Sequence, residues 1–260
     1  MLMSTANRLL NVLALFTMDR PEWSVEEAAT ELDMTLSTTY RYFRSLVEAG
    51  LVAAHTPSRY TLGPAIIRFD RQMRLLDPLI VAARPVMRRL ARELGPHIWV
   101  PLCRLYRTDV MCVHQETLEP PDLANDFERQ PVSYGRGQLM PLHRGAPSKA
   151  ILANMNFRLV RPIYDGDPAA MAAVGLGGNW TEVKRSLRAL RSAGAVITSG
   201  ELQGGMQGIA VPIFDQQVVI GSLSIIMQQS REMPPRETLV PRLTEGARQI
   251  EEIMTAAASR

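Results

Sequence analysis

Apolar positions recur with a helical period through the first third of the chain. The first such segment spans residues 1–16 and predicts one helix. Its inner face is expected to consist of four apolar side chains, Leu9, Leu10, Leu13 and Phe16. Ser24 and Glu27 have the spacing of a capping box, which predicts that a second, short helix begins at Ser24.

A third helix is predicted from Leu36 to Ala49, after a turn at residues 33–35. Gly50 suits the left-handed position just beyond the end of this helix. One side of the helix is expected to face inward through Thr39, Tyr42, Phe43, Leu46 and Val47. The opposite side carries hydroxyl and guanidinium groups, on Ser37, Tyr40, Arg41, Arg44 and Ser45.

Two short runs after this helix, 51–54 and 59–62, predict a β-hairpin that turns at residues 55–58. A short helix, a tight turn, a polar helix with two arginines and a hairpin occur here in the order of a winged helix-turn-helix. Hydroxyl groups bond phosphates or base edges, and arginine forks onto guanine. The expected DNA contacts are therefore Thr35, Ser37, Thr38, Tyr40, Arg41, Arg44, Ser58 and Arg59. The alternative is an ordinary helical hairpin with a solvated polar face.

Residues 64–95 predict two amphipathic helices that are separated by Asp77 and Pro78. Seven arginines make this region basic, a composition also found in helices that bind membrane surfaces or nucleic acid. We interpret the first helix as a connector between domains. Its apolar residues are available for packing, including against a second subunit: Ile66, Ile67, Phe69 and Met73.

Beyond Ile98 the apolar period shortens to two. Residues 99–106 and 110–118 predict a hairpin that turns at Arg107 and Thr108, and residues 116–131 are expected to form a loop with some extended structure. The remaining elements are predicted as helices at 146–154, 157–164, 180–193 and 236–258, and strands at 195–199, 208–214 and 218–227. This order favours an antiparallel sheet covered by helices, an α+β domain.

Length and composition are consistent with a two-domain protein. The chain has 260 residues, and no apolar run is long enough to cross a bilayer. Residues 1–16 lack the positive cluster and the cleavage site of a signal peptide. We therefore expect a cytoplasmic protein without a membrane partner.

The charge of the chain does not by itself identify a nucleic-acid-binding protein. The net charge is +3, and residues 1–62 contain five arginines against seven carboxylates. Most of the acids precede the third predicted helix, whereas the arginines mark that helix and the hairpin. Attraction to phosphate depends on the presented surface. One copy should bind weakly, which favours dimers on paired half-sites.

The two cysteines, Cys103 and Cys112, lie in strand-like segments that the predicted hairpin would place opposite each other. We expect buried free thiols, as is usual in the cytoplasm. Two cysteines and four scattered histidines do not have the spacing of a metal site. No metal and no cofactor are expected.

Three segments together carry a family resemblance. They read MTLSTTYRYFRSLVEAGLV followed by SRYTLGPAI, then MPLHRGAPSKAILA, then SGELQGGMQGIAVPIFDQQVVIGSLSI. In this order and spacing they resemble the IclR-type bacterial transcription regulators, over nearly the whole chain and least at 116–131 and 156–178. The resemblance implies a winged helix-turn-helix, a linker helix and a GAF- or PAS-like antiparallel-sheet domain that encloses one small ligand.

The resemblance also implies where an effector would be held. The matching positions are Met140, Leu142, Gly145, Ala146, Thr198, Gly208, Ser224 and Ile226. Independently of the family, backbone N–H groups at the first turn of the helix that begins at Ala146 can hold a carboxylate, and serine and threonine hydroxyls can orient its oxygens.

The chain departs from small-acid-binding members at two of these positions. Ile226 stands where a second serine occurs, and Gly208 stands where a small polar residue occurs. Both changes favour a larger, less polar ligand, such as an aromatic carboxylate. The alternative is that Met140, Leu142 and Ile226 belong to the core and that Ser224 is an internally bonded strand hydroxyl.

A catalytic alternative rests on three residues. His143 and Ser148, with Glu201 as the orienting acid, would form a hydrolase of an acyl or amide substrate joined to a DNA-binding domain. The chain has no nucleophile elbow, and LQGGMQG lacks the spacing of a phosphate-binding loop. We therefore do not expect an enzyme.

These patterns together predict three segments: a DNA-binding domain at 1–62, a linker helix at 63–77, and an effector-binding and oligomerisation domain at 78–260. The expected function is ligand-controlled binding of double-stranded operator DNA by a homodimer, further assembled as a dimer of dimers. The effector would be a small organic acid, with an aromatic carboxylate or a related catabolite favoured. A constitutive repressor whose pocket has lost its ligand is a further alternative.

Overall fold

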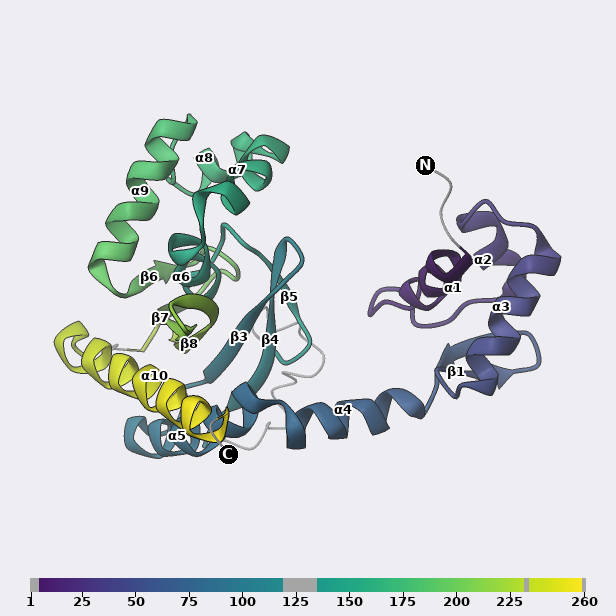
Figure 1. The fold of residues 1–260 in the computed structure, drawn as a ribbon, viewed down its shortest axis with the longest axis horizontal. Helices are drawn as coiled ribbons and strands as arrows, with labels where there is room; N and C mark the ends of the chain where they lie inside the picture. The colour runs from purple at the N-terminus through teal and green to yellow at the C-terminus, as the bar shows by residue number, and fades with distance from the viewer. Residues whose placement is uncertain (1–4, 119–134, 232–233, 259–260) are drawn as a thin grey trace. The chain divides into compact units, whose positions relative to one another are not determined.

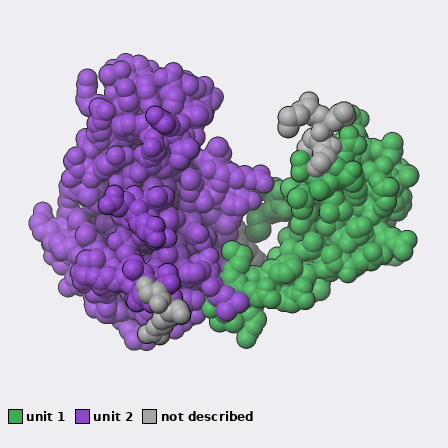
Figure 2. Space-filling model, viewed as in Figure 1, with its two compact units in different colours: residues 1–75 green, residues 76–260 purple. Residues whose placement is uncertain are grey.

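The computed structural model describes residues 5–118, 135–231 and 234–258. The chain divides into two compact units, residues 1–75 and 76–260 (Figure 2). Each unit has its own hydrophobic core. Most of the predicted loop at 116–131 lies outside the described residues.

Unit 1 is a helical unit with a small hairpin. Its elements are α1 (Thr5–Ala14), α2 (Val25–Glu31), α3 (Leu36–Glu48), β1 (Val52–Thr56), β2 (Arg59–Leu62) and α4 (Ala65–Leu76), whose last residue falls in unit 2. The predicted capping box is present: the Ser24 hydroxyl accepts from Glu27 N at 3.1 Å, and the Glu27 carboxylate accepts from Ser24 N at 3.2 Å. Local chemistry therefore fixes the start of α2, as predicted.

The core of unit 1 lies beneath α3. Tyr42, Phe43 and Leu46 are each at most 5% exposed, and they pack with Val12 and Trp23. The predicted inner face of α3 is thus confirmed, with one error. The Val47 side chain is 40% exposed, because it lies on the edge of the apolar stripe in the last turn of the helix.

The predicted inner face of α1 is also partly wrong. Leu10 is 55% exposed, whereas Val12 is fully buried. The buried or half-buried residues recur at helical spacing, which turns the inner face away from Leu10. They are Leu9, Val12, Leu13 and Phe16.

The hairpin of unit 1 is held to the segment before α2. Trp23 and Tyr60 exchange two backbone hydrogen bonds, of 3.1 and 2.9 Å. β1 continues through His55 and Thr56, which were predicted to belong to the turn, so the turn consists of Pro57 and Ser58. A register shift between Ala54 and Thr56 absorbs the additional residues.

Unit 2 contains a six-stranded antiparallel sheet with helices on both faces (Figure 1). Its helices are α5 (Pro78–Leu94), α6 (Ala146–Asn154), α7 (Phe157–Gly166), α8 (Pro168–Ala173), α9 (Trp180–Ala193) and α10 (Arg236–Ala258). Its strands are β3 (Val100–Tyr106), β4 (Asp109–Glu116), β5 (Leu139–Pro141), β6 (Val196–Ser199), β7 (Met206–Asp215) and β8 (Val218–Gln228). The spatial order is β5-β4-β3-β8-β7-β6.

Two apolar layers enclose this sheet. α5 and α10 lie side by side and cover one face, through residues such as Leu79, Val86 and Leu243 (Figure 1). α6, α7 and α9 pack on the other face, where Ile151 and Leu187 are fully buried. The predicted α+β fold is confirmed. A short helix, α8, was not predicted.

The start of α5 is tied directly to the sheet. The Asp77 carboxylate accepts from Leu79 N at 3.0 Å and from Ile80 N at 3.1 Å, so it caps the helix. Its second oxygen accepts from Arg104 Nη1 of β3 at 2.6 Å. Asp77 therefore follows the last residue of α4, caps α5 and joins β3.

Within the described ranges, none of the helices is long and apolar enough to span a membrane.

Candidate DNA-binding surface and effector site

The outer side of α3 presents polar groups in one stripe. Ser37, Tyr40, Arg41 and Arg44 are all exposed, and Tyr40 is 49% exposed. Residues on the opposite side of the same helix, including Phe43 and Leu46, are 1% exposed. Burial on one side thus fixes which side chains the helix offers to a partner.

The first turn of α3 is capped by another predicted DNA contact. The Thr35 hydroxyl accepts from Thr38 N at 3.4 Å and donates to Thr38 Oγ1 at 2.9 Å. Both hydroxyls lie at the N-terminal end of the helix, where partial positive charge and free N–H groups favour phosphate.

The polar groups of the stripe differ in their present partners. Tyr40 Oη donates to Glu26 Oε1 at 2.9 Å, and this bond raises the pKa of the Tyr40 phenol. Arg44 Nε is 2.9 Å from Glu48 Oε1, in an exposed pair one helical turn apart. Such pairs contribute only about 0.3–0.5 kcal/mol and are readily exchanged for a phosphate or a base. Arg41 has no carboxylate partner among the described residues; its guanidinium lies 5.7 Å from the centre of the Tyr42 ring.

Arg59, in the β1–β2 hairpin that forms the wing, is held more firmly than Arg41 and Arg44. Arg59 Nη1 donates to Glu27 Oε2 at 2.8 Å, and Arg20 Nη2 lies 3.0 Å from the same oxygen. The Ser24 N–H, with further help from Arg20 and Arg59, lowers the pKa of Glu27. Arg59 therefore joins the wing to the start of α2, while Ser58 is exposed in the turn.

Four of the predicted effector residues lie together on the α6 face of the sheet. Gly208 of β7 pairs with Thr198 of β6 on one side and with Ile226 of β8 on the other, and Ser224 lies two residues from Ile226. Directly paired residues share a face of the sheet. A Cβ placed on Gly208 would lie 3.7 Å from Ala146 Cβ, so the start of α6 covers this patch.

Gly208 and Ile226 are coupled by packing. The same Cβ on Gly208 would lie 2.5 Å from Ile226 Cδ1. The Ile226 side chain therefore fills the space that a larger residue at 208 would take. The two departures from the small-acid-binding pattern compensate each other in volume, and they leave a less polar patch.

A carboxylate already lies at the start of α6. Glu201 Oε2 accepts from Gly145 N at 2.9 Å, and Glu201 Oε1 lies 2.6 Å from Lys149 Nζ. The Lys149 side chain is 7% exposed and also donates to Val174 O at 3.2 Å. Gly145 has a φ of +83°, in the left-handed region where glycine is favoured. The first turn of α6 thus binds an anionic group of the protein itself.

The other predicted pocket residues are part of the core. Met140 and Leu142 are each 1% exposed and pack with the residues beneath α6 and α7. The Ser224 hydroxyl is fully buried and donates to Pro101 O at 3.4 Å. Leu142 also lines a surface cavity at the other side of the bend that precedes α6.

The residues of the hydrolase alternative do not form a catalytic arrangement. Ser148 Oγ is fully buried and has no hydrogen-bond partner within the described ranges, so it is not bonded to His143. Glu201 bonds Lys149 and Gly145 instead of orienting the imidazole. Burial, with further contributions from Arg144 and Lys149, lowers the pKa of His143.

The cysteines lie opposite each other, as the hairpin predicted. Cys103 and Cys112 are paired across β3 and β4 and are free, buried thiols. Burial, together with a hydrogen bond to Cys112, raises the pKa of the Cys103 thiol well above its ordinary value. Across the described ranges, no three metal-binding side chains are grouped.

Two buried polar residues near the effector patch were not predicted to contribute. Lys149 pairs with an acid 52 residues away, and Ser222 Oγ is buried without a hydrogen-bond partner among the described residues. A lysine inside the apolar run SKAILA was the available signal for Lys149. Ser222 gave no such signal, because a serine in a strand is ordinary.

Comparison with known proteins gives two family matches. Residues 5–55 match the IclR helix-turn-helix domain, and residues 76–252 match the C-terminal domain of the bacterial transcriptional regulator IclR. No curated protein matches the chain.

Solved structures resemble the chain over nearly its full length. An IclR transcriptional regulator from Alicyclobacillus acidocaldarius is 24% identical, with 98% of this chain and 100% of that chain covered and a TM-score of 0.75. One from Brucella abortus is 21% identical, with 96% and 92% covered and a TM-score of 0.74. An IclR homologue from Microbacterium hydrocarbonoxydans, solved in complex with 4-hydroxybenzoate, is 21% identical, with 97% and 100% covered and a TM-score of 0.74.

At these sequence identities the solved structures establish that the fold is shared, whereas the family models establish membership of the family. The C-terminal model alone spans more than half of the 260 residues, and the N-terminal model covers the helix-turn-helix. The chain therefore belongs to the IclR family of bacterial transcription regulators, which join a DNA-binding helix-turn-helix domain to a C-terminal effector domain.

Proposed function

We propose that this regulator reads operator DNA with the outer stripe of α3. Ser37, Tyr40, Arg41 and Arg44 would enter the major groove, while Thr35 and Thr38 bond phosphates at the N-terminal end of the helix. Ser58 and Arg59 of the wing would contact the adjacent backbone. The single observation that carries this proposal is the division of α3 into an exposed polar side and a buried apolar side.

Arg41 is the strongest candidate for a base contact. It has no ion pair to break within the described part of the chain, whereas Tyr40 and Arg44 must first leave Glu26 and Glu48. Arg59 is already bonded to Glu27, which holds its side chain in place. We therefore assign it a contact with the DNA backbone and not with a base.

The regulator would act as a homodimer, and further as a dimer of dimers, on paired half-sites. Unit 1 has no excess of cations, with eight arginines against eight carboxylates, so two linked copies would supply the affinity that one copy lacks. α4 supports this arrangement, because Ile67, Met73 and Leu76 are 73%, 50% and 73% exposed. The work would take place in the cytoplasm, where bacterial operator DNA is found.

The effector would be a small organic acid, with an aromatic carboxylate favoured. Gly145 N donates to one carboxylate oxygen of Glu201, which supports an anion preference at the start of α6. The less polar patch made by Gly208 and Ile226 supports an apolar ligand body. The 4-hydroxybenzoate complex of the Microbacterium hydrocarbonoxydans homologue supports the same class. Thr198 and Ser224 would complete the site.

Control of DNA binding would follow from linkage. The acid changes DNA affinity only to the extent that it binds one arrangement of the regulator more tightly than another. The proposed control involves no catalytic step, which is in keeping with a family of transcription regulators.

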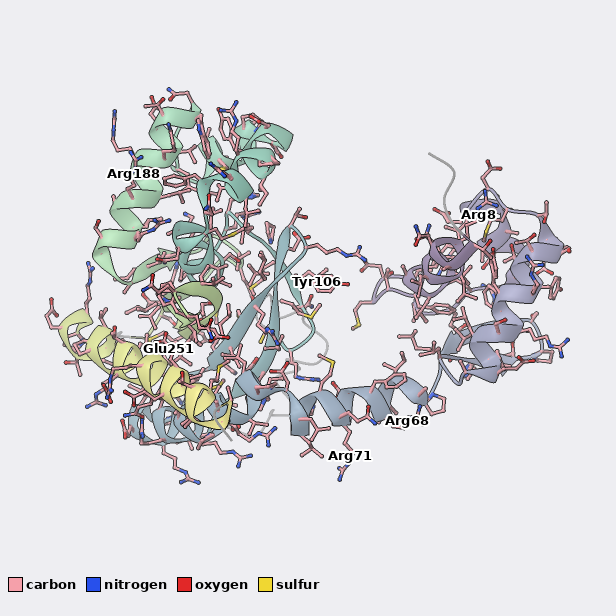
Figure 3. The ribbon with its side chains drawn as sticks, in the orientation of Figure 1. Arg8, Arg68, Arg71, Tyr106, Arg188 and Glu251 are labelled. Atoms are coloured by element: carbon pink, nitrogen blue, oxygen red, sulfur yellow. The ribbon has the colours of Figure 1, made fainter. Side chains whose placement is uncertain are left out.

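The DNA proposal is tested with a duplex that the wild-type protein selects from a random library. Arg41→Ala and Arg44→Ala should each weaken binding to this duplex about tenfold in a gel-shift titration, because one base contact by arginine contributes roughly 1–3 kcal/mol. The matched control is Arg71→Ala, an exposed arginine that projects from α4 (Figure 3). Wild-type affinity in both α3 variants would refute α3 as the reading helix.

The effector proposal is tested with benzoate and 4-hydroxybenzoate in thermal-shift titrations of the full chain, because a ligand stabilises the state that binds it. One of these acids should raise the melting temperature, and the double variant Thr198→Leu, Ser224→Leu should lose the shift while it retains DNA binding. An unchanged dose response in the double variant would place the effector elsewhere.

A further inference from the structure

A cavity of about 280 Å³ opens beside the bend that precedes α6. Three parts of unit 2 enclose it. Thr108 and Asp109 come from the β3–β4 turn and the start of β4, Leu142 and His143 come from the bend, and Gly166, Asp167 and Met171 come from the end of α7 and from α8 with its N-cap. It lies apart from the patch of Thr198, Gly208, Ser224 and Ile226, none of which lines it.

The cavity has an apolar floor and a polar rim. Leu142 and Met171 are each 1% exposed, whereas Thr108 and Asp167 are exposed. An apolar cavity of about 150 Å³ accommodates benzene. The volume here therefore suits one aromatic ring with a short arm, whose ring lies on the floor and whose polar end reaches the rim.

The charge at the rim is negative and is not neutralised by the protein. Asp109 and Asp167 have no ion-pair partner in the part of the chain that the structure describes. One oxygen of Asp167 accepts from Ala170 N at 2.9 Å and caps α8, which leaves the second oxygen available. Within the described part of the chain, the Asp109 carboxylate accepts one side-chain hydrogen bond, from the Thr108 hydroxyl at 3.5 Å.

The neighbouring cations are directed elsewhere. Arg144 donates to the carbonyl oxygen of Glu201, and Lys149 Nζ bonds the Glu201 carboxylate. Burial lowers the pKa of His143, although Asp167 and Asp109 act in the opposite direction, and a neutral imidazole offers one donor and one acceptor without adding positive charge. An anionic ligand would therefore meet two carboxylates at the rim, whereas a cation would neutralise them.

From this combination of shape and charge, we propose that the cavity binds a small aromatic primary amine. Its ammonium group lies between Asp109 and Asp167, and its ring lies against Leu142 and Met171. The ligand has the opposite charge to the acid proposed for the effector patch, so the two sites do not compete. Because His143 precedes Gly145 by two residues, the amine contacts the bend that leads into the first turn of α6.

The test is isothermal titration calorimetry of the full chain at pH 7 with three probes of similar shape: 2-phenylethylamine, 2-phenylethanol and 3-phenylpropionate. The amine should bind with one site per chain and at least about tenfold more tightly than the alcohol, since a charge-assisted bond is roughly twice as strong as a neutral one. Heat from the amine no greater than that from the alcohol would overturn the proposal, as would tighter binding of 3-phenylpropionate.

Two variants remove the charge at the rim without disturbing the fold. Asp167→Asn keeps the cap of α8, because asparagine is an equally good N-cap, and Asp109→Asn keeps the size of its side chain. Each should weaken the amine about tenfold. The matched control is Asp165→Asn, a surface acid of α7 that pairs with Arg161 and does not line the cavity. An equal loss of amine affinity in the control would mean that general surface charge causes the effect, and it would refute the proposed site.

A third variant fills the cavity. Gly166 lines it at the end of α7, and a Cβ placed there has no heavy atom within 4 Å, so Gly166→Leu introduces bulk without strain. It should abolish binding of the amine while leaving the melting temperature and the response to benzoate unchanged. Undiminished amine binding in this variant would place the amine elsewhere. Benzoate tests the proposed effector patch separately, so failure of one site is distinguished from failure of the other.

Discussion

Breaking the Lys149–Glu201 pair should measurably destabilise unit 2. The two charged atoms are 2.6 Å apart, and the side chains are 7% and 22% exposed. Removing one partner from a buried pair costs about 3–5 kcal/mol, because the other charge is left without compensation. Glu201 retains some contact with water, so we expect the lower end, about 3 kcal/mol.

Two single variants and their combination measure this contribution. Glu201→Gln leaves the buried ammonium without a counter-charge, and Lys149→Met leaves the carboxylate with only Gly145 N. In a domain of this size, about 3 kcal/mol corresponds to a decrease of roughly 6–12 °C in melting temperature. The double variant should lose less than the sum of the two singles, with a coupling energy of roughly 1–3 kcal/mol.

Calorimetry of the full chain at pH 7 provides the assay. The matched control is Lys184→Met, because Lys184 is the other lysine of the chain and is not paired with an acid among the described residues. Additive losses in the double variant would refute the coupling. Single losses below about 1 kcal/mol would show instead that the pair behaves like an exposed one.

Two further predictions concern Glu251 and Gly63. Glu251 on α10 accepts from Phe214 N at 2.8 Å, and burial raises the pKa of its carboxyl above the ordinary 4.5 (Figure 3). The folded protein therefore retains this proton longer than the unfolded chain does, and stability falls as the pH rises from 4.5 through the raised pKa. Glu251→Gln should remove this decrease in urea titrations across that range, whereas a difference from wild type that does not change with pH would contradict it. Gly63→Ala would place a Cβ 2.3 Å from Gly50 O, so it should lower the stability of unit 1 by about 1–3 kcal/mol, as judged from its melting. Gly166→Ala, in open space, is the control, and equal melting of the two variants would refute the steric reasoning.

Elements whose ends are marked by a helix cap, a proline or a tight turn were predictable from the sequence. Ser24 with Glu27 begins α2, Asp77 with Pro78 separates α4 from α5, and the two-residue turn at Arg107 places Cys103 opposite Cys112. Each of these signals acts over a few residues and needs no tertiary contact. The helical period of Tyr42, Phe43 and Leu46 likewise sufficed to orient α3 and hence the proposed DNA-binding stripe.

Features that depend on distant partners were not predictable. α8 consists of PAAMAA, in which only Met171 is buried, so no apolar period marks it. The Lys149–Glu201 pair joins residues 52 positions apart, and the filling of the Gly208 space by Ile226 depends on the pairing of β7 with β8. The cavity beside His143 arises where three separate segments meet, and no one of them indicates it.

Asp77 lies between α4 and α5 and is bonded to the sheet. β8, which carries Ser224 and Ile226, pairs with β3, and β3 reaches Asp77 through Arg104. The same carboxylate holds the first N–H groups of α5. The strand that carries two of the proposed effector residues is therefore linked to the first turn of α5 through one neighbouring strand and one guanidinium.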